Sequence, residues 1–403
     1  MGVKPGFKLT ELGVIPDDWT LAHVENVALI TTGSKNTQDR VEDGQYPFFV
    51  RSQTVERINS YSFNGEAVLT AGDGVGTGKV FHYINGPFDV HQRVYRISNF
   101  SERINGYFFY LYFSSHFYNR IMQMTAKSSV DSVRRDMIAR MLVPLPPTEA
   151  EQRAIATTLS DVDALLGGLD RLIAKKRDIK QAAMQQLLTG QTRLPGFGRE
   201  WEVKTLHEVC QKIQDGTHFS PKPGGNDYLY VTSKNIRFGR LDMSTAERIS
   251  AAEHLKIYAR CDVRMGDLLL TKDGANTGNA ALNSLDEPFS LLSSVAMLRF
   301  DSRDHVAAYF MYQILSTYGQ LQIKEAMSGN AITRLTLKKI RALRFLAAPF
   351  TEQAAIAGVL SDMDSELSAL MARRDKTRAL KQAMMQELLT GKTRLIQARA
   401  AHA

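Results

Sequence analysis

Residues 72–79, GDGVGTGK, form the segment whose residue types come nearest to a known chemical motif. A phosphate-binding P-loop needs a glycine five residues before its Gly-Lys pair and a serine or threonine after it. This chain has Asp73 and Val80 at those positions, and Thr77 stands where a dinucleotide-binding loop would need a glycine. We therefore interpret the segment as a turn-rich β-hairpin.

Methyl transfer and metal binding are excluded on similar grounds. Residues 85–88, NGPF, differ from the Asn-Pro-Pro-aromatic loop of amino-methyltransferases by Gly86 in place of the essential proline, and no suitable cofactor loop accompanies them. The nine histidines and two cysteines form neither a His-x-x-x-His nor a Cys-x-x-Cys spacing. His82, His91 and His218 are expected to be surface or groove residues. The sequence predicts no catalytic residue and no metal site.

Net charge points to a different chemistry, the binding of a polyanion. The 403 residues carry a formal charge of +8, and contacts between basic side chains and phosphates release condensed counterions. Base readout additionally uses basic, amide and hydroxyl side chains on loops that face a groove. For each such residue the alternative is an ordinary solvated loop side chain.

Candidate DNA-binding residues lie on corresponding loops of two related segments, yet differ between them. In the first segment we expect Arg51, Ser52, Gln53, Asp73, Lys79, His91, Gln92, Arg93, Lys127, Ser128 and Ser129 to face DNA. In the second we expect Thr217, His218, Thr232, Lys234, Asn235, Lys272, Asp273, Asn276, Ser293, Ser294, Asn330 and Thr333. The basic pairs Arg134-Arg135 and Lys338-Lys339 are expected to hold phosphates.

An internal duplication must position these loops. The 43 residues from Gln152 recur from Gln353 at a constant offset of 201 without a gap, and 24 of the 43 are identical. Each copy predicts one long helix, because apolar residues alternate steps of three and four as in a coiled coil. The predicted helix-pair core is Ile155, Leu159, Val162, Leu166, Leu169, Ile356, Leu360, Met363, Leu367 and Leu370.

The ends of both helices carry recognisable signals. Thr148 and Thr351 are candidate N-caps after prolines, and Gly190 and Gly391 suit the left-handed position that ends a helix. Since about 150 residues separate the copies, an antiparallel pair is possible. The alternative is two ordinary amphipathic helices, each capping its own core.

The segments before each helix are related more loosely. VRSQTV from Val50 echoes VTSKNI from Val231, LTAGDGVGTGK from Leu69 echoes LLTKDGANTGN from Leu269, and YFFY from Tyr107 echoes YFMY from Tyr309. Short β-branched runs, glycine turns and one aromatic helix predict an α+β domain in each. The predicted boundaries are 1–147 and 195–349 for the two domains, 148–194 and 350–395 for the helices, and 396–403 for a tail.

A duplicated long helix that begins with Glu-Gln after proline and ends in LLTGxTR resembles the specificity subunits of type I restriction–modification systems. The residues that carry the resemblance are Pro146, Pro147, Glu151, Gln152, Thr192 and Arg193, and Pro349, Glu352, Gln353, Thr393 and Arg394 in the second copy. The family implies two target-recognition domains separated by an antiparallel coiled coil with pseudo-twofold symmetry. Each domain would read half of a split target in double-stranded DNA.

The resemblance also implies partners and leaves this chain non-catalytic. Two modification subunits would bind S-adenosylmethionine and methylate adenine, and two restriction subunits would use ATP and magnesium. No cofactor is expected on this chain. The amino-terminal residues do not suit a signal peptide, so a cytoplasmic protein without membrane contact is expected. A coiled-coil interaction scaffold without DNA specificity, or a stand-alone enzyme, are the alternative functions.

Overall fold

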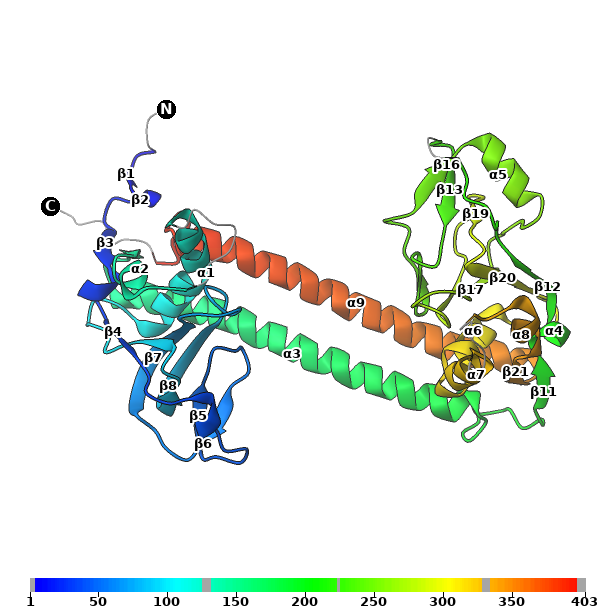
Figure 1. Cartoon of the computed structure of the whole chain (residues 1–403), viewed down its shortest axis with the longest axis horizontal. Helices are drawn as coiled ribbons and strands as arrows, with labels where there is room; N and C mark the ends of the chain where they lie inside the picture. The colour runs from blue at the N-terminus through cyan, green and yellow to red at the C-terminus, as the bar shows by residue number, and fades with distance from the viewer. Residues whose placement is uncertain (1–3, 125–131, 223–224, 328–333, 397–403) are drawn as a thin grey trace. The chain divides into compact units, whose positions relative to one another are not determined.

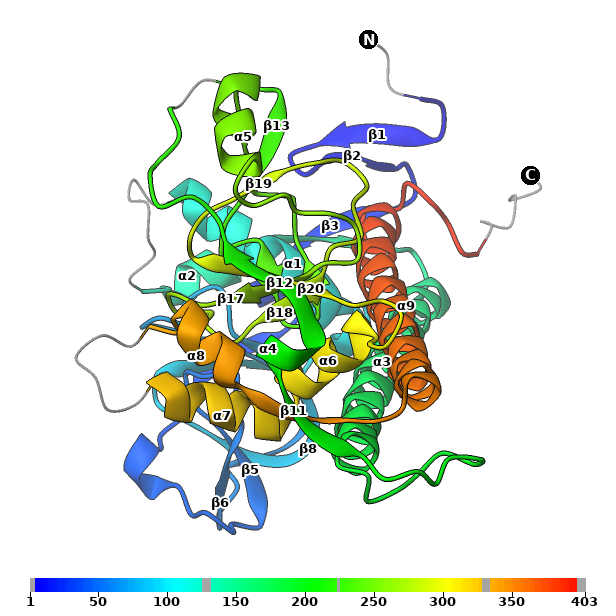
Figure 2. The same cartoon turned by 90° about the vertical axis from the view of Figure 1, so that its right-hand side faces the viewer.

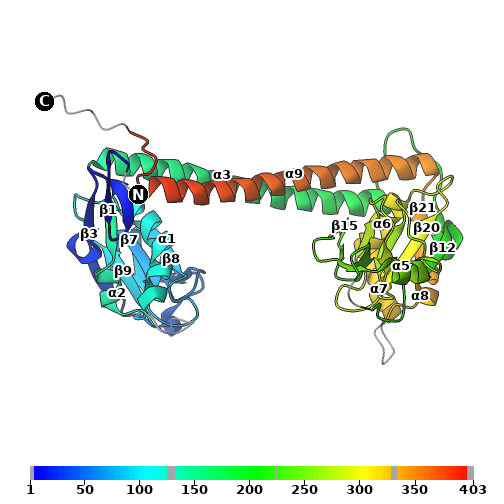
Figure 3. The ribbon, with the colours of Figure 1, turned by 90° about the horizontal axis from the view of Figure 1, so that it is seen from above.

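The chain folds into two compact units, each of which contains half of both long helices. The structure is a computed structural model, and it describes residues 4–124, 132–222, 225–327 and 334–396. The first unit comprises Met1–Asp170 with Arg373–Ala403, and the second comprises Arg171–Ala372. The long helices are α3 (Glu149–Leu188) and α9 (Phe350–Leu388). They run side by side in Figures 1 and 3.

Ion pairs between α3 and α9 fix their antiparallel register in each unit. In the first unit Lys381 Nζ lies 2.7 Å from an Asp163 carboxylate oxygen. In the second unit Lys180 Nζ lies 2.5 Å from Asp364. The two pairs correspond to each other under the sequence offset of 201, so both units contain the same helix contact. The predicted pair of packed long helices is confirmed.

The helix ends agree with the sequence signals in three of four places. Gly190 and Gly391 adopt φ values of 72° and 69°, which are left-handed as predicted. The Thr148 hydroxyl accepts the N–H of Glu151 at 3.3 Å. The prediction for Thr351 was wrong, because α9 begins one residue earlier, at Phe350. There the Pro349 carbonyl accepts the backbone N–H groups of Glu352 and Gln353, which draws Thr351 into the first turn.

The Glu-Gln pair at the start of each long helix links that helix to the segment after the other long helix and to the segment before the aromatic helix. The buried Glu352 carboxylate accepts two hydrogen bonds from Arg193, each 2.6 Å long. Glu151 is held in the same way by Arg394, whose Nη2 lies at 2.7 Å. These arginines end the LLTGxTR motif of the opposite helix, which explains why both motifs occur in both copies.

The neighbouring glutamines, Gln152 and Gln353, bind corresponding segments in the two units. Gln152 accepts the Asn105 N–H at 2.7 Å and donates to the Arg103 carbonyl at 2.9 Å. Gln353 accepts the Val306 N–H at 2.9 Å and donates to the Ala348 carbonyl at 2.7 Å. Both glutamines therefore fasten the segment that leads into the aromatic helix of the unit.

The first unit contains a six-stranded sheet in the order β4-β9-β7-β8-β5-β6, in which β5 and β8 are parallel. Two two-stranded sheets, β1-β2 and β10-β3, lie outside it. The elements are β1 (Phe7–Thr10), β2 (Gly13–Pro16), β3 (Thr20–His23), η1 (Val24–Asn26), β4 (Leu29–Thr32), η2 (Thr37–Asp39), β5 (Tyr46–Phe49), β6 (Glu56–Ile58), β7 (Phe63–Ala71), β8 (Phe81–Val90), β9 (Val94–Ser98), α1 (Gly106–Met124), α2 (Arg135–Ala139) and β10 (Leu142–Leu145).

The second unit repeats this strand order in two pieces, β12-β20-β17-β18 and β16-β13-β19, with β13 and β19 parallel. The division arises because two short strands, β18 and β19, replace the continuous β8. The elements are β11 (Glu202–Thr205), α4 (Leu206–Val209), β12 (Cys210–Asp215), β13 (Tyr228–Val231), β14 (Ile236–Arg237), β15 (Arg240–Leu241), β16 (Glu247–Ile249), α5 (Ala251–Tyr258), β17 (Leu268–Thr271), β18 (Ala280–Leu282), β19 (Ser290–Leu291), β20 (Val295–Phe300), α6 (Ala307–Leu315), α7 (Thr317–Met327), α8 (Leu337–Ala342) and β21 (Arg344–Ala347).

The core of each unit lies between its sheet, its aromatic helix and the ends of the long helices. Aromatic residues of α1, such as Phe109 and Phe113, stack on one another in the first unit. In the second unit α6 packs against β17 and β18, as Figure 2 shows. Burying apolar area at roughly 25 cal/mol per Å² makes these contacts the main source of stability. Both units are α+β, as predicted.

The predicted helix-pair core residues divide between two environments. Ile155 and Leu159 join the core of the first unit with Leu388 of α9 and Leu389, which follows it, and Ile356 and Leu360 join that of the second unit. Farther along the helices, Leu169 and Leu367 are buried, whereas Val162, Leu166, Met363 and Leu370 are half-buried. The apolar stripe therefore serves a domain core at each helix start and the helix pair beyond it.

Candidate DNA interface

Three loops of the first unit meet around the carboxylate of Asp73. Arg51 follows β5, Asp73 lies between β7 and β8, and Arg93 lies between β8 and β9. Arg51 Nη1 is 2.7 Å from Asp73 Oδ1, and Arg93 Nη1 is 3.4 Å from Asp73 Oδ2. Two arginines predicted from sequence therefore contact the same predicted aspartate.

The turn that carries Asp73 is the predicted hairpin between the antiparallel strands β7 and β8. Gly74 has a φ of 80°, which favours glycine. The Thr77 hydroxyl donates to the Gly74 carbonyl at 2.6 Å, and Val133 N–H donates to the Gly72 carbonyl at 2.7 Å. The latter bond places the start of α2, with Arg134 and Arg135, beside the turn.

Two histidines support the same loops from inside. Burial lowers the pKa of His91, and the nearby Arg51 guanidinium lowers it further. Its Nδ1 accepts the Arg93 N–H at 3.0 Å. Burial also lowers the pKa of His82, although its hydrogen bond to the Ser52 carbonyl opposes that shift. Both side chains are buried, so the structure places them beneath the loop surface.

Of the other candidates in the first unit, six are exposed and three lie outside the residues that the structure describes. The exposed ones are Ser52, Gln53, Lys79, Gln92, Arg134 and Arg135. Lys127, Ser128 and Ser129 lie outside the described residues.

The second unit has the same turn at Asp273. Gly274 has a φ of 89°, and the Thr277 hydroxyl donates to its carbonyl at 2.7 Å. Leu335 N–H donates to the Lys272 carbonyl at 3.1 Å, which places the start of α8 beside the turn. Here the arginine on the carboxylate is Arg334, with Nη2 2.8 Å from Asp273 Oδ2. Arg334 was not among the residues predicted from sequence, and its counterpart in the first unit is Ser132.

Lys272 and Asp215 form a buried ion pair that two exposed side chains, Arg260 and His218, also contact. Lys272 Nζ lies 3.3 Å from the Asp215 carboxylate, and both side chains are at most 5% exposed. Arg260 and His218 contact the same carboxylate at 3.4 and 3.3 Å. The Lys272 ammonium thus faces Asp215 and not solvent, a partnership across 57 residues that sequence spacing does not reveal.

A hollow of about 540 Å³ brings four candidates of the second unit together, namely Thr232, Lys234, Asn235 and Asn276. Lys234 is exposed, whereas the buried Asn235 accepts the Thr232 N–H at 2.9 Å. Thr217 and Ser293 are buried, and Ser294 accepts the Ser233 N–H at 3.2 Å. Lys338 and Lys339 lie on α8, while Asn330 and Thr333 lie outside the described residues.

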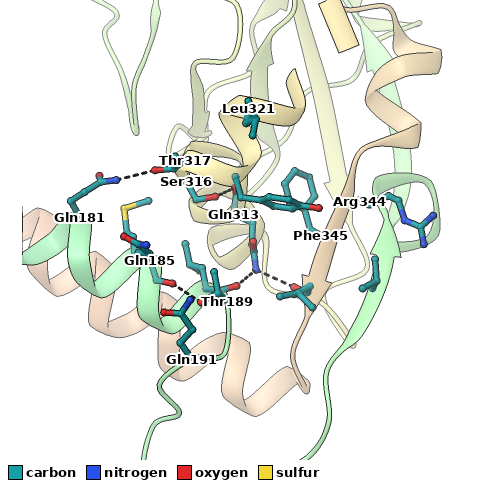
Figure 4. A pocket seen from close by; sticks show the side chains of 15 residues that line it. Gln181, Gln185, Thr189, Gln191, Gln313, Ser316, Thr317, Leu321, Arg344 and Phe345 are labelled. Carbon is teal, nitrogen blue, oxygen red and sulfur yellow. Dashed lines mark hydrogen bonds between the residues drawn. The ribbon is translucent and has the colours of Figure 1, made fainter. Parts of the chain in front are cut away.

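Another cavity in the second unit, about 520 Å³, has different chemistry (Figure 4). It lies between the last turns of α3, helices α6 and α7, and β21. Gln313 donates to the carbonyls of Leu188 and Leu346 at 3.0 and 3.1 Å, so it fastens α6 to the end of α3. Tyr318 and Leu321 are half-exposed at its rim. This apolar cavity is separate from the polar loops.

Among the described residues, no cluster of three or more His, Cys, Asp or Glu side chains is arranged to hold a metal ion. Within the same residues, no helix has the length and apolar character needed to span a bilayer.

Comparison with known proteins identifies the family. The family described as type I restriction modification DNA specificity domain matches residues 16–174 and 198–377. The chain is 22% identical over 407 residues to the MjaVIII type I restriction enzyme specificity subunit of Methanocaldococcus jannaschii, with 94% of each chain covered. It is 24% identical over 430 residues to the putative MjaX specificity subunit of the same organism, with 97% of each covered.

A solved structure shares the fold. The crystal structure of the type I restriction–modification S subunit from M. genitalium matches with a TM-score of 0.66 and 17% identity, covering 96% of this chain and 99% of that chain. The family match covers most of both units, including the loops around Asp73 and Asp273. The chain therefore belongs to the type I restriction–modification DNA-specificity family, whose specificity subunit is itself non-catalytic and assembles with other subunits.

Proposed function

We propose that this specificity subunit reads a split target in double-stranded DNA, one half-site with the loops of each unit. The observation that carries the proposal is the shared Asp-Gly turn, which has the same backbone in both units but different polar neighbours. A common scaffold with unlike side chains suits two readers of unlike sequences, because base edges are distinguished by donor and acceptor pattern.

The basic pairs next to the turns hold the DNA backbone. Arg134 and Arg135 start α2, and Lys338 and Lys339 lie in the first turn of α8. Phosphate contacts from such residues fix orientation without reading sequence. Their replacement by alanine weakens binding to all sequences and makes binding less sensitive to salt.

The helices α3 and α9 connect the two readers and set the length of the unread spacer between half-sites. Their surfaces also dock two modification subunits, because a repeated helix offers the same partner site twice. Those partners carry S-adenosylmethionine and methylate adenine, and restriction subunits add ATP- and magnesium-dependent activity. This chain supplies target selection alone and works in the cytoplasm with them.

The test is methylome sequencing of cells that express this chain with the modification subunit of its host. The expected result is adenine methylation within one bipartite motif, and none when either subunit is expressed alone. Methyl transfer by the isolated chain contradicts the proposal. So does a complex that binds DNA without sequence preference, the outcome expected of an interaction scaffold.

A further inference from the structure

We propose that Asp73 and Asp273 are positioning residues that aim an arginine at a guanine in each half-site. The guanine-reading residues are Arg51 in the first unit and Arg334 in the second. This inference rests on the proposed function, in which these loops face DNA, and it adds the base that is read and the residues that determine it.

The geometry leaves each arginine both oriented and accessible. Arg51 and Arg334 give one terminal nitrogen to an aspartate at 2.7 and 2.8 Å, yet their side chains remain 45% and 42% exposed. A guanidinium has five N–H donors. Nε of Arg334 is buried, and the donors that neither pair with the aspartate nor lie buried are left to reach the O6 and N7 acceptors of guanine. Holding the side chain beforehand reduces the entropy lost on binding.

Arg93 completes the arrangement in the first unit. Its Nη1 lies 3.4 Å from Asp73 Oδ2, the oxygen that Arg51 does not use. The backbone N–H of Arg93 is fixed by His91. Arg93 therefore fixes the second oxygen of the carboxylate and limits its rotation.

The two units share the aspartate but differ in the position of the arginine that contacts it. Asp73 and Asp273 occupy the same position of the same turn. The residues of the second unit that correspond to Arg51 and Arg93 are Thr232 and Ser294, while Arg334 corresponds to Ser132. Ser132 forms a β-bridge with Asp73, so in the first unit it lies beside the aspartate, as Arg334 lies beside Asp273 in the second. The carboxylate is retained while the arginine reaches it from another segment of the chain, as expected if its direction suits a different half-site.

A purely stabilising ion pair is the competing explanation. Exposed ion pairs add little to stability, because solvent screens them and ordering long side chains costs entropy. Lys272 and Asp215 show what a structural pair looks like in this protein, since both side chains are buried. The pairs at Asp73 and Asp273 are open to solvent on the arginine side.

The experiment uses the full chain carrying Asp73→Asn or Arg51→Lys, expressed together with its modification subunit. The methylated motifs are then determined by sequencing. Each variant is expected to relax one guanine of the first half-site, with discrimination falling about 10- to 100-fold, and to leave the second half-site unchanged. Asp273→Asn and Arg334→Lys are expected to relax a guanine of the second half-site only. Glu56→Gln, which breaks an exposed pair with Arg40 at 3.6 Å, is the matched control and keeps the motif intact.

The outcomes distinguish this inference from the proposed function. If the wild type methylates a bipartite motif but the Arg51 and Arg334 variants keep every guanine, the inference is overturned and split-site reading stands. If the wild type methylates no bipartite motif, the proposed function itself fails. Thermal melting checks that each variant folds, and should an aspartate variant unfold, the arginine-to-lysine variants decide the matter because they keep the charge.

Discussion

At the scale of single residues, His82 is expected to make the stability of the first unit depend on pH. Its pKa is lowered because burial disfavours the imidazolium. A histidine of this kind contributes stability that is present above its unfolded pKa, near 6.5, and lost as pH falls through the folded value. We expect the free energy of unfolding to fall between pH 7 and pH 5, and His82→Gln to remove part of that fall.

The measurement is chemical denaturation of both proteins across this pH range. Glutamine is chosen because its amide donates a hydrogen bond to the Ser52 carbonyl, as His82 does, without taking up a proton. The variant should match the wild type near pH 7.5. An identical loss of stability in both proteins at low pH would contradict the expectation.

Residue types predicted the candidate site better than they predicted its contacts. Arg51, Asp73 and Arg93 were selected from loops that correspond between the repeats, and they do meet. Lys272 was selected by the same logic, but it pairs with a buried aspartate on a distant strand. Arg334 was not predicted, and its contact with Asp273 joins residues that lie 61 positions apart in the sequence. Loop correspondence identifies places, whereas partners depend on tertiary packing.

At the scale of elements, the buried Glu151 makes the end of α9 essential to the first unit. Its side chain is 2% exposed, and Arg394 contacts it. Arg394→Met leaves this carboxylate buried without its counterion, which costs about 3 kcal/mol. Thermal denaturation should show a lower Tm for the variant, and adding Glu151→Gln should recover part of it. A Tm equal to that of the wild type would argue against this role of the LLTGxTR motif.

Sequence periodicity was enough to predict the long helices but not the sheets. Both long helices and their terminal glycines could be predicted, because a 43-residue repeat fixes the pattern locally. The sheets could not, since many strands have only two to four residues and pair across long sequence separations. Thr351 failed as a cap for a local reason, because the Pro349 carbonyl accepts the N–H groups of Glu352 and Gln353 and Thr351 thus lies inside the first turn of α9.

At the scale of the whole molecule, the two units are joined by continuous helices, so helix length is expected to control the recognised spacer. Seven residues inserted into each helix at the unit boundary, after Asp170 in α3 and after Ala372 in α9, preserve the heptad phase. At 1.5 Å per residue the helices lengthen by roughly 10 Å. Since base pairs are stacked about 3.4 Å apart, the spacer should grow by about three base pairs.

Methylome sequencing of the insertion variant measures the spacer directly, because both half-sites stay readable and only their separation changes. Insertion into α3 alone is the control. It shifts pairs such as Lys180 with Asp364 out of register, so it should lower stability without producing a longer motif. An unchanged spacer in a folded double-insertion variant would show that the modification partners, and not these helices, fix the distance between the readers. A longer spacer would place that control in α3 and α9.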